Sequence, residues 1–310
     1  MMDSFILCKS TKIKQNKLLY VVKIFIFDAK HVSLQPDRVV PMNIVIVIPI
    51  YKSVLSADEE QSLRQCMRVL GNYKILLVCP EGLDLSAYHM VAGRQLPFES
   101  FSSYYFASID GYNHLLMSPC FYERFSGDDY MLIYQLDAWV FRDELDNWCK
   151  QGYDYVGAPW FELNRSHEEG YDLWLVGNGG LSLRRIEKFL TTSSLPSMSK
   201  VKTCHQVFRQ EYHSFSDLGH CLFRCMGPWV GTNSIRHIRK RYQEDFFFCY
   251  GLRGSNYELS TPSPQQAALF AFECSPEYLF NEVTHGQLPF GCHAWRKYQY
   301  EEFWKQYIKI

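Results

Sequence analysis

One carboxylate, Asp137, interrupts a stretch that is otherwise almost wholly apolar and aromatic, Tyr130–Phe141. A charged side chain at the end of a buried strand is unfavourable unless a cation or a hydrogen-bond donor meets it. In open α/β sheets, ligands bind outside the carboxyl ends of the strands. We therefore expect Asp137 to contact a metal or a ligand. The alternative is that it caps a helix that begins just after Asp143.

The neighbouring carboxylates Glu244 and Asp245 could provide a general base for a hydroxyl nucleophile. Adjacent helical residues point about 100° apart, so only one of the two is expected to face a cleft. We choose Asp245, because the three phenylalanines that follow it indicate that the chain turns inward there. Glu244 is expected on the polar side. The alternative is that both carboxylates only favour the positive end of a helix dipole.

Two further segments contain residue types that suit a binding site. Gly177–Gly180 lacks the spacing of a dinucleotide fingerprint or a phosphate loop, but its backbone could approach a ligand closely, with Asn178 as donor and acceptor. A tight turn with positive φ is the alternative. His293 is either a metal ligand or a histidine satisfied by hydrogen bonds. The basic run Arg236–Arg241 is typical of a solvated face, and contact with phosphate or nucleic acid is the second interpretation.

The elements that must position these residues alternate along the chain. The β-branched run Asn43–Tyr51 and the run Tyr73–Cys79 predict buried parallel strands, with a helix over Ala57–Leu70 between them. An exposed strand over Phe101–Ala107 and a helix over Ile109–Phe125 are expected next. This alternation predicts one α/β domain with a mostly parallel central sheet and helices on both faces.

Composition limits the classes of protein that remain. The 310 residues are 47% hydrophobic and 21% charged, as in globular proteins, and the net charge of −1 gives no bulk attraction for nucleic acid. The 11 cysteines are scattered without a CxxC motif, which indicates reduced thiols in a cytoplasmic protein. Residues 1–41 place lysines before a short apolar run, too short to span a bilayer. We predict a non-essential extension over 1–41, a domain over 43–300 and a tail over 301–310.

Several short motifs occur in a fixed order along the chain. They are Pro49-x-Tyr51, Leu136-Asp137-Ala138-Trp139, Gly157-Ala158-Pro159-Trp160, Gly177 to Arg184, Glu244-Asp245 and Phe290-Gly291-Cys292-His293. In this set the chain resembles a bacterial, largely uncharacterised glycosyltransferase-like family of the GT-A type. The resemblance implies transfer of a sugar from a nucleotide-sugar donor to a hydroxyl acceptor by an inverting reaction. The expected process is the synthesis of cell-surface polysaccharide or another glycan.

The resemblance also implies roles for individual residues. It places Pro49, Tyr51, Asn113 and Asp137 at the donor, and Trp160, Asn178, Gly179, Gly180 and Ser182 at the sugar and acceptor. Asp137 and His293 would hold a divalent cation, Mn²⁺ or Mg²⁺, that neutralises the leaving diphosphate. The usual Asp-x-Asp motif is reduced here to Gln135-Leu136-Asp137. Glu244 and Asp245 match an acidic pair whose carboxylate accepts the proton of the acceptor hydroxyl.

The implied partners are a nucleotide sugar and a glycan or lipid-linked acceptor, without nucleic acid and without a transmembrane segment. The chain would then be cytoplasmic or peripheral at the inner face of the membrane. One alternative is a non-catalytic nucleotide- or sugar-binding module on the same fold. A nucleotidyltransferase is disfavoured, because Pro49–Ser53 has no glycine-containing basic loop after the first strand.

Overall fold

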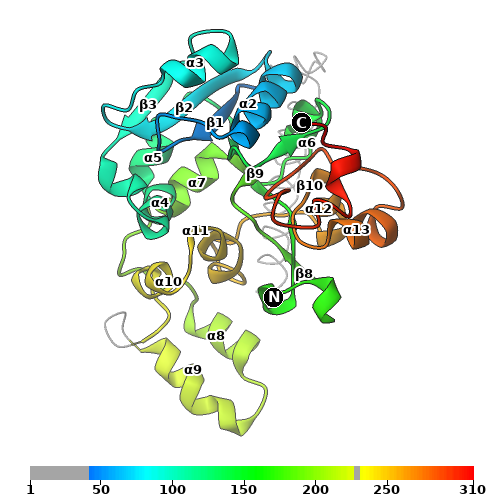
Figure 1. Ribbon diagram of the computed structural model, residues 1–310. Coiled ribbons are helices and arrows are strands. Elements are labelled where there is room, and N and C mark those ends of the chain that lie inside the picture. The colour runs from blue at the N-terminus through cyan, green and yellow to red at the C-terminus, as the bar shows by residue number, and fades with distance from the viewer. Residues whose placement is uncertain (1–41, 227–230) are drawn as a thin grey trace, which may run out of the picture. The chain divides into compact units, whose positions relative to one another are not determined.

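A six-stranded sheet lies at the centre of the computed structural model, which describes residues 42–226 and 231–310. The strand order is β3 (Phe98–Phe101), β2 (Lys74–Pro80), β1 (Ile44–Pro49), β4 (Tyr130–Tyr134), β9 (Leu181–Arg185) and β6 (Tyr155–Val156) (Figure 1). All strands except β9 run in one direction. The predicted mostly parallel α/β fold is confirmed. The extension predicted over 1–41 lies outside the described residues.

Both faces of the sheet are covered, because successive side chains of a strand point to opposite sides. In β1, Ile44, Ile46 and Ile48 join one apolar core, and Val45 and Val47 join the other. The first core is covered by α2 (Ala57–Leu70), α3 (Ser86–Ala92) and α6 (Leu145–Lys150), and the second by α4 (Ile109–Leu116), α5 (Pro119–Glu123), α7 (Ile186–Ser193) and α10 (Ile235–Arg241). α12 (Pro264–Phe270) contributes to both.

Helix α2 has the bounds that the sequence predicts. Ser56 and Glu59 form a capping box at its start, acidic residues occupy its first turn, and Gly71 follows its last residue. Its inner face also carries polar groups. Ser62 Oγ donates to the carbonyl oxygen of Ala138 at 2.7 Å, and Gln65 Nε2 donates to that of Val140 at 2.5 Å. The helix therefore fixes the chain just before β5 (Trp139–Val140) and at the last residue of that strand.

Two local predictions are wrong. The helix predicted over Ile109–Phe125 is divided into α4 and α5, because Pro119 begins the second helix and disfavours a helical conformation at the residue before it. The strand predicted over Phe101–Ala107 is a 3₁₀ turn over Ser103–Phe106, and β3 lies earlier. Ser102 accepts a hydrogen bond from the backbone N–H of Tyr104, which favours the turn.

The C-terminal part of the chain forms a third apolar cluster around a small sheet of β5, β10 (Ala271–Phe272) and β11 (Gly291–Cys292). The last ten residues, predicted to be a tail, contribute Phe303, Trp304 and Ile308, which are all buried. Burial of large apolar side chains of this kind is favourable enough to hold a chain terminus in place.

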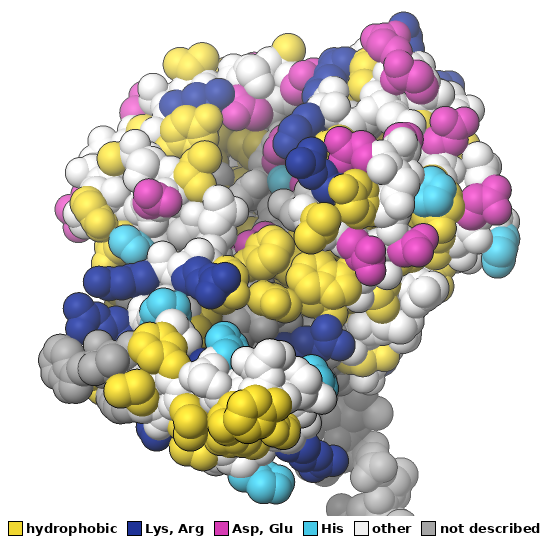
Figure 2. All heavy atoms as spheres, turned by 90° about the horizontal axis from the view of Figure 1, so that it is seen from below, with side chains coloured by type: hydrophobic (Ala, Val, Ile, Leu, Met, Phe, Trp, Pro, Cys, Tyr) yellow, Lys and Arg dark blue, Asp and Glu magenta, His cyan; other side chains and the backbone are white. Residues whose placement is uncertain are grey.

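A helical segment separates β9 and α7 from α12. It contains α8 (Cys204–Glu211), α9 (Leu218–Cys225), α10 and the short α11 (Glu244–Phe246), which continues as a π-helical turn over Phe247–Gly251 (Figure 1). Apolar side chains of α8, α9 and their connection, among them Phe215 and Leu222, are exposed next to basic side chains (Figure 2). No helix in the described part of the chain has both the length and the apolar character needed to cross a bilayer.

Candidate functional site

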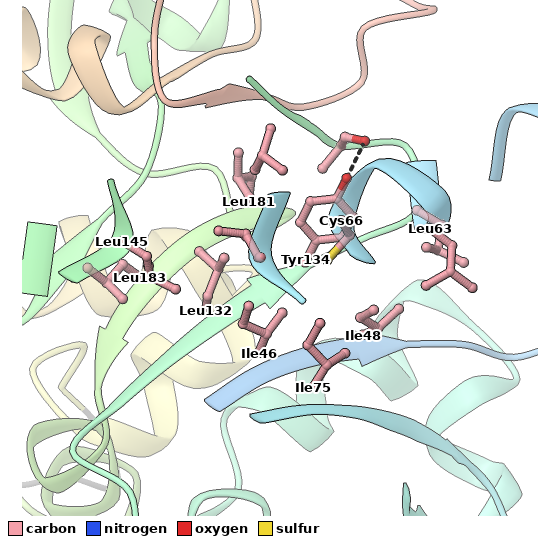
Figure 3. Packing of buried hydrophobic residues seen from close by; sticks show 14 of the residues in the cluster. Ile46, Ile48, Leu63, Cys66, Ile75, Leu132, Tyr134, Leu145, Leu181 and Leu183 are labelled. Atoms are coloured by element: carbon pink, nitrogen blue, oxygen red, sulfur yellow. Dashed lines mark hydrogen bonds between the residues drawn. The ribbon is translucent and has the colours of Figure 1, made fainter. Parts of the chain in front are cut away.

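The turn that carries Asp137 is held by the core beneath it. β4 ends at the buried Tyr134, whose hydroxyl lies 3.1 Å from the carbonyl oxygens of Ser62 and Ala138 (Figure 3). Leu136 packs into the same core, so the alternating Asp137 side chain points outward and is 55% exposed. The next helix, α6, begins at Leu145 without a side-chain cap, and the helix-cap alternative for Asp137 is therefore wrong.

His293 joins Asp137 from the other end of the domain. Its Nε2 lies 3.1 Å from Oδ1 of Asp137 and 3.2 Å from Oε1 of Gln135, and its Nδ1 lies 3.0 Å from Oε2 of Glu273. Burial lowers the pKa of His293, but the charges of Glu273 and Asp137 outweigh it and raise the pKa to about 10. Desolvation raises the pKa of Asp137, and His293 more than reverses this effect. The structure thus brings together the two residues predicted as metal ligands.

The donor atoms of this group suit a divalent cation. Separations close to 3 Å are those of neighbouring ligands on an octahedral ion with bonds of about 2.1 Å. A neutral His293 that donates its Nδ1 proton to Glu273 turns the lone pair of Nε2 toward the oxygens of Asp137 and Gln135. In residues 42–226 and 231–310, no three His, Cys, Asp or Glu side chains form a metal cluster by themselves. Any cation held between Asp137 and His293 would take its third protein ligand from the amide oxygen of Gln135.

A hollow of about 640 Å³ opens beside Asp137 at the carboxyl ends of β1 and β4. Its lining includes Pro49, Tyr51 and Asp137, three of the four residues predicted to bind the donor. Lys52, which the sequence interpretation missed, also lines it. Nζ of Lys52 lies 2.8 Å from Glu59, and the hydrogen bond to that carboxylate raises the pKa of Lys52.

Asn113, the fourth predicted donor residue, has another role. Its Oδ1 accepts a hydrogen bond of 2.8 Å from the backbone N–H of Glu244, and its Nδ2 donates to the carbonyl oxygen of Ile109. It is not part of the lining of the hollow. Asn113 therefore connects α4 to the start of α11 and positions the acidic pair.

In the loop between β8 (Leu173–Val176) and β9, Gly177 and Gly180 are needed because neighbouring rings lie too close for a side chain, and not because their backbone has a positive φ. Asn178 takes the positive φ of 62°, whereas Gly177 and Gly180 have none. A Cβ atom on Gly177 would overlap the ring of Trp160, and one on Gly180 would overlap the ring of His293. Since β9 is antiparallel to β4, this loop lies at the same end of the sheet as Asp137.

Trp160 and Ser182, both predicted to face the sugar, are buried and support this loop. Trp160, on β7 (Pro159–Phe161), stacks on Phe246 with ring centroids 4.2 Å apart, and its Nε1 donates to Oδ1 of Asn178. Ser182 Oγ donates to the carbonyl oxygen of Gly179 at 2.9 Å. Nδ2 of Asn178 is buried without a hydrogen-bond partner among the described residues, so it remains able to donate to a ligand.

Glu244 occupies the opposite environment to the predicted one. It is buried, and its Oε1 lies 2.5 Å from Nη1 of the buried Arg184, in an ion pair without the alignment of a hydrogen bond. Burial raises the pKa of Glu244 to about 7, although Arg184 lowers it in part. Arg184 also bonds to the hydroxyl of Tyr122 and lies against the ring of Phe189. The only available signal for this partner was an arginine that alternates with Leu181 and Leu183 along the segment Leu181–Arg185.

Asp245 is less buried than Glu244 and lies close to the His293 group. Burial raises its pKa, the backbone N–H of Phe246 lowers it, and the charge of Glu273 raises it again. Glu273 is the residue that contacts His293. A Cβ atom on Gly179 would lie 3.0 Å from Oε2 of Glu244 and 4.0 Å from Cβ of Asp245. The glycine loop therefore connects the acidic pair, on one side, to the imidazole on the other.

The structure is an α/β domain with a mostly parallel sheet and a hollow at the ends of its central strands, the place where ligands bind in folds of this kind. A family model described as "Protein of unknown function (DUF5672)" matches residues 95–293, and the chain belongs to this family. Among curated proteins, none matches the chain.

Several solved structures show a weak likeness. The galactosyltransferase LgtC, in complex with donor and acceptor sugar analogues, is 14% identical over 80% of this chain and 86% of that chain, with a TM-score of 0.44. Core-mannan synthase A from Aspergillus fumigatus, in an Mn/GDP form, is 10% identical over 66% and 71%, with a TM-score of 0.36. A glycosyltransferase involved in glycosylation of the major capsid of PBCV-1 is 10% identical over 82% and 93%, with a TM-score of 0.36. At these values the likeness supports neither a substrate nor a mechanism.

Proposed function

We propose that this chain is a glycosyltransferase-like enzyme that transfers a sugar from a nucleotide-sugar donor to a hydroxyl acceptor. The observation that carries the proposal is the hollow at the ends of β1 and β4, which opens directly beside Gln135, Asp137 and His293. Tyr51, on the wall of this hollow, is 64% exposed and offers an aromatic face on which a nucleotide base can stack.

The charges around the hollow favour a cation as cofactor. Lys52 is the one Lys or Arg in its described lining, and Glu59 pairs with it. Asp137 adds a further negative charge, so the protein by itself leaves a diphosphate unneutralised. Gln135, Asp137 and His293 would hold Mn²⁺ or Mg²⁺, which when bound neutralises the leaving diphosphate. The oxygen ligands from Gln135 and Asp137 suit Mn²⁺ and Mg²⁺ alike.

We assign the catalytic base to Asp245. A carboxylate whose pKa is raised toward neutrality is a stronger acceptor for the proton of a sugar hydroxyl. The proton moves from the hydroxyl to Asp245 as the new glycosidic bond forms and the diphosphate leaves with the electrons of the old one, so the reaction inverts. Glu244, held by Arg184, fixes the backbone that carries Asp245, and Asn178 is available to bind a sugar hydroxyl.

The expected process stays as the sequence suggests: synthesis of cell-surface polysaccharide or another glycan, in the cytoplasm or at the inner face of the membrane. The acceptor would be a glycan or a lipid-linked sugar. Residues 1–41 are proposed to be non-essential for activity.

This function can be tested by measuring the melting temperature of the protein with a panel of nucleotide sugars, each with and without Mn²⁺. A ligand that binds only the folded chain raises the melting temperature. At a ligand concentration of 100 times the dissociation constant, the free energy of unfolding increases by about 2.7 kcal/mol. We expect one donor to do so with Mn²⁺ and the shift to vanish in Asp137→Asn. The exposed Asp172→Asn is the matched control. Binding without turnover would instead support a non-catalytic module, and no shift with any donor would contradict the proposal.

A further inference from the structure

A second hollow, of about 600 Å³, lies in the helical segment and shares no lining residue with the hollow beside Asp137. Its walls come from α8, α9, α10 and the chain from Tyr250 to Glu258. Six basic or imidazole side chains line it: Lys202, His220, Arg224, His237, Arg241 and Arg253. Its volume is typical of a site for a small molecule.

Internal ion pairs satisfy only some of these cations. Glu211 lies 2.8 Å from Nη1 of Arg224, 3.3 Å from Nζ of Lys202 and 3.6 Å from Nε2 of His220, so one carboxylate serves all three. Glu258 is the second carboxylate of the lining and accepts a hydrogen bond from the backbone N–H of Gly254. For Arg241 and Arg253, the described residues include no carboxylate in an ion pair with either guanidinium.

Two details point to an anionic ligand. Nε of Arg224 is buried and has no hydrogen-bond partner within the described part of the chain, although its Nη1 is paired. The guanidinium of Arg241 lies over the ring of Tyr242, 5.4 Å from its centroid, which orients its donors. Preoriented guanidinium groups bind phosphate through paired, charge-assisted hydrogen bonds.

The charge of the whole segment agrees with this conclusion. Residues 200–258 contain nine Lys and Arg against five Asp and Glu, whereas the complete chain has a net charge of −1. In Figure 2, magenta side chains lie mostly in the upper half of the face, whereas dark-blue ones occur in both halves. An anion that approaches this protein is therefore attracted to the helical segment.

We propose that this hollow binds the phosphate or diphosphate group of a phosphorylated acceptor. The inference rests on the proposed function, because it makes the occupant the second substrate of that reaction. Tyr242 lines the hollow and stacks on Phe246, and Asp245 lies between them in the chain. One short segment thus forms the wall of the anion site and carries the base. An acceptor bound by its phosphate at this wall presents its sugar hydroxyl toward Asp245.

Binding can be measured by isothermal titration with inorganic phosphate, pyrophosphate and octyl phosphate as probes, in EDTA and without nucleotide sugar. The omission of metal and donor removes any contribution from the hollow beside Asp137, so this test stands even if no sugar is transferred. We expect Arg241→Gln and Arg253→Gln each to weaken pyrophosphate binding about tenfold or more, since each removes a charged hydrogen bond. Lys240→Gln is the matched control, because Lys240 is the exposed neighbour of Arg241 on α10 and does not line the hollow.

Unchanged binding in both arginine variants, or an equal loss in Lys240→Gln, would overturn the site. A phosphorylated acceptor further requires octyl phosphate to bind more tightly than inorganic phosphate, since its substituent fills the remaining volume. Equal affinities would overturn the assignment to an acceptor and leave a site for a free anion. Both arginines are exposed, and the melting temperature of each variant verifies that the fold is intact.

Discussion

Glu244 and Asp245 are neighbours in the chain, yet one is paired with Arg184 in the interior and the other lies under the glycine loop. We expect Asp245→Asn to lower kcat by about 10²–10⁴-fold, the typical contribution of general-base catalysis, with donor binding nearly unchanged. Steady-state kinetics together with donor titration would measure both quantities.

The matched variant is Glu244→Gln, which should retain far more activity per folded molecule. Above about pH 7, where Glu244 is ionised, this substitution leaves Arg184 buried without a charged partner, so its main effect is expected on stability. If Glu244→Gln were inactive and Asp245→Asn active, the two roles would have to be exchanged. If both were active, the inverting-base mechanism would fail.

The raised pKa of Glu244 has a measurable effect on stability. The folded chain keeps this proton up to about pH 7, whereas the ordinary value is 4.5. The stability linked to the proton is complete below about pH 4.5 and is lost as the pH rises to 7. We expect the melting temperature of the wild type to fall relative to Glu244→Gln over this interval, by roughly 5–10 °C for a chain of this size. A constant difference from pH 4.5 to 8 would show that Arg184 keeps Glu244 ionised throughout.

Among the elements, the reversed strand β9 has the greatest effect on the site, because the loop that leads into it touches both His293 and the acidic pair. Gly180→Ala is expected to displace the His293 ring and to abolish the Mn²⁺-dependent thermal shift, at a stability cost of about 1–3 kcal/mol. Gly179→Ala is the control in the same loop. Its Cβ would meet the side chains of Glu244, Arg184 and Asp245 but not the ring of His293, so Mn²⁺ dependence should persist. Equal retention of the shift in both variants would remove His293 from the metal site.

The elements that the sequence predicts well are those with local signals. The capping residues of α2 and the continuous β-branched run of β1 identify both without reference to the rest of the chain. β9 was not recognised, because its residues Ser182 and Arg184 are polar and their burial depends on partners distant in the chain. The same dependence on distant partners explains why Glu244 is buried and why Asn113 binds the backbone of Glu244 and does not line the hollow. Asp137 and His293 could be paired from the family resemblance, but Glu273 and Lys52 could not.

At the scale of the whole molecule, the two ends of the chain should differ in importance. Residues Met42–Ile310 form one compact unit, and removal of 301–310 would take Phe303, Trp304 and Ile308 from the third cluster. Loss of one buried aromatic side chain costs about 3–5 kcal/mol, so a chain ending at Tyr300 should be largely unfolded at 37 °C. Circular dichroism and limited proteolysis would measure this.

A chain beginning at Met42 is the counterpart and should melt and bind its donor like the full chain. Aggregation of that shortened protein would refute the prediction that residues 1–41 are non-essential. Native-like melting of the chain that ends at Tyr300 would contradict the structural importance assigned to the third cluster.

The bond between Gln135 and His293 joins residues 158 positions apart, and this separation has a consequence for biosynthesis. At translation rates of about 5–20 residues per second, roughly 8–30 s pass between the appearance of the first residue and that of the second. During this interval β1, β2 and β4 can already pair. His293 and the C-terminal aromatic residues have not yet been synthesised, and Glu273 is absent for most of the time. A nascent chain can thus form the sheet and the hollow before His293, the proposed metal ligand, has been synthesised. The proposed metal site can be completed only after that residue has been added to the chain.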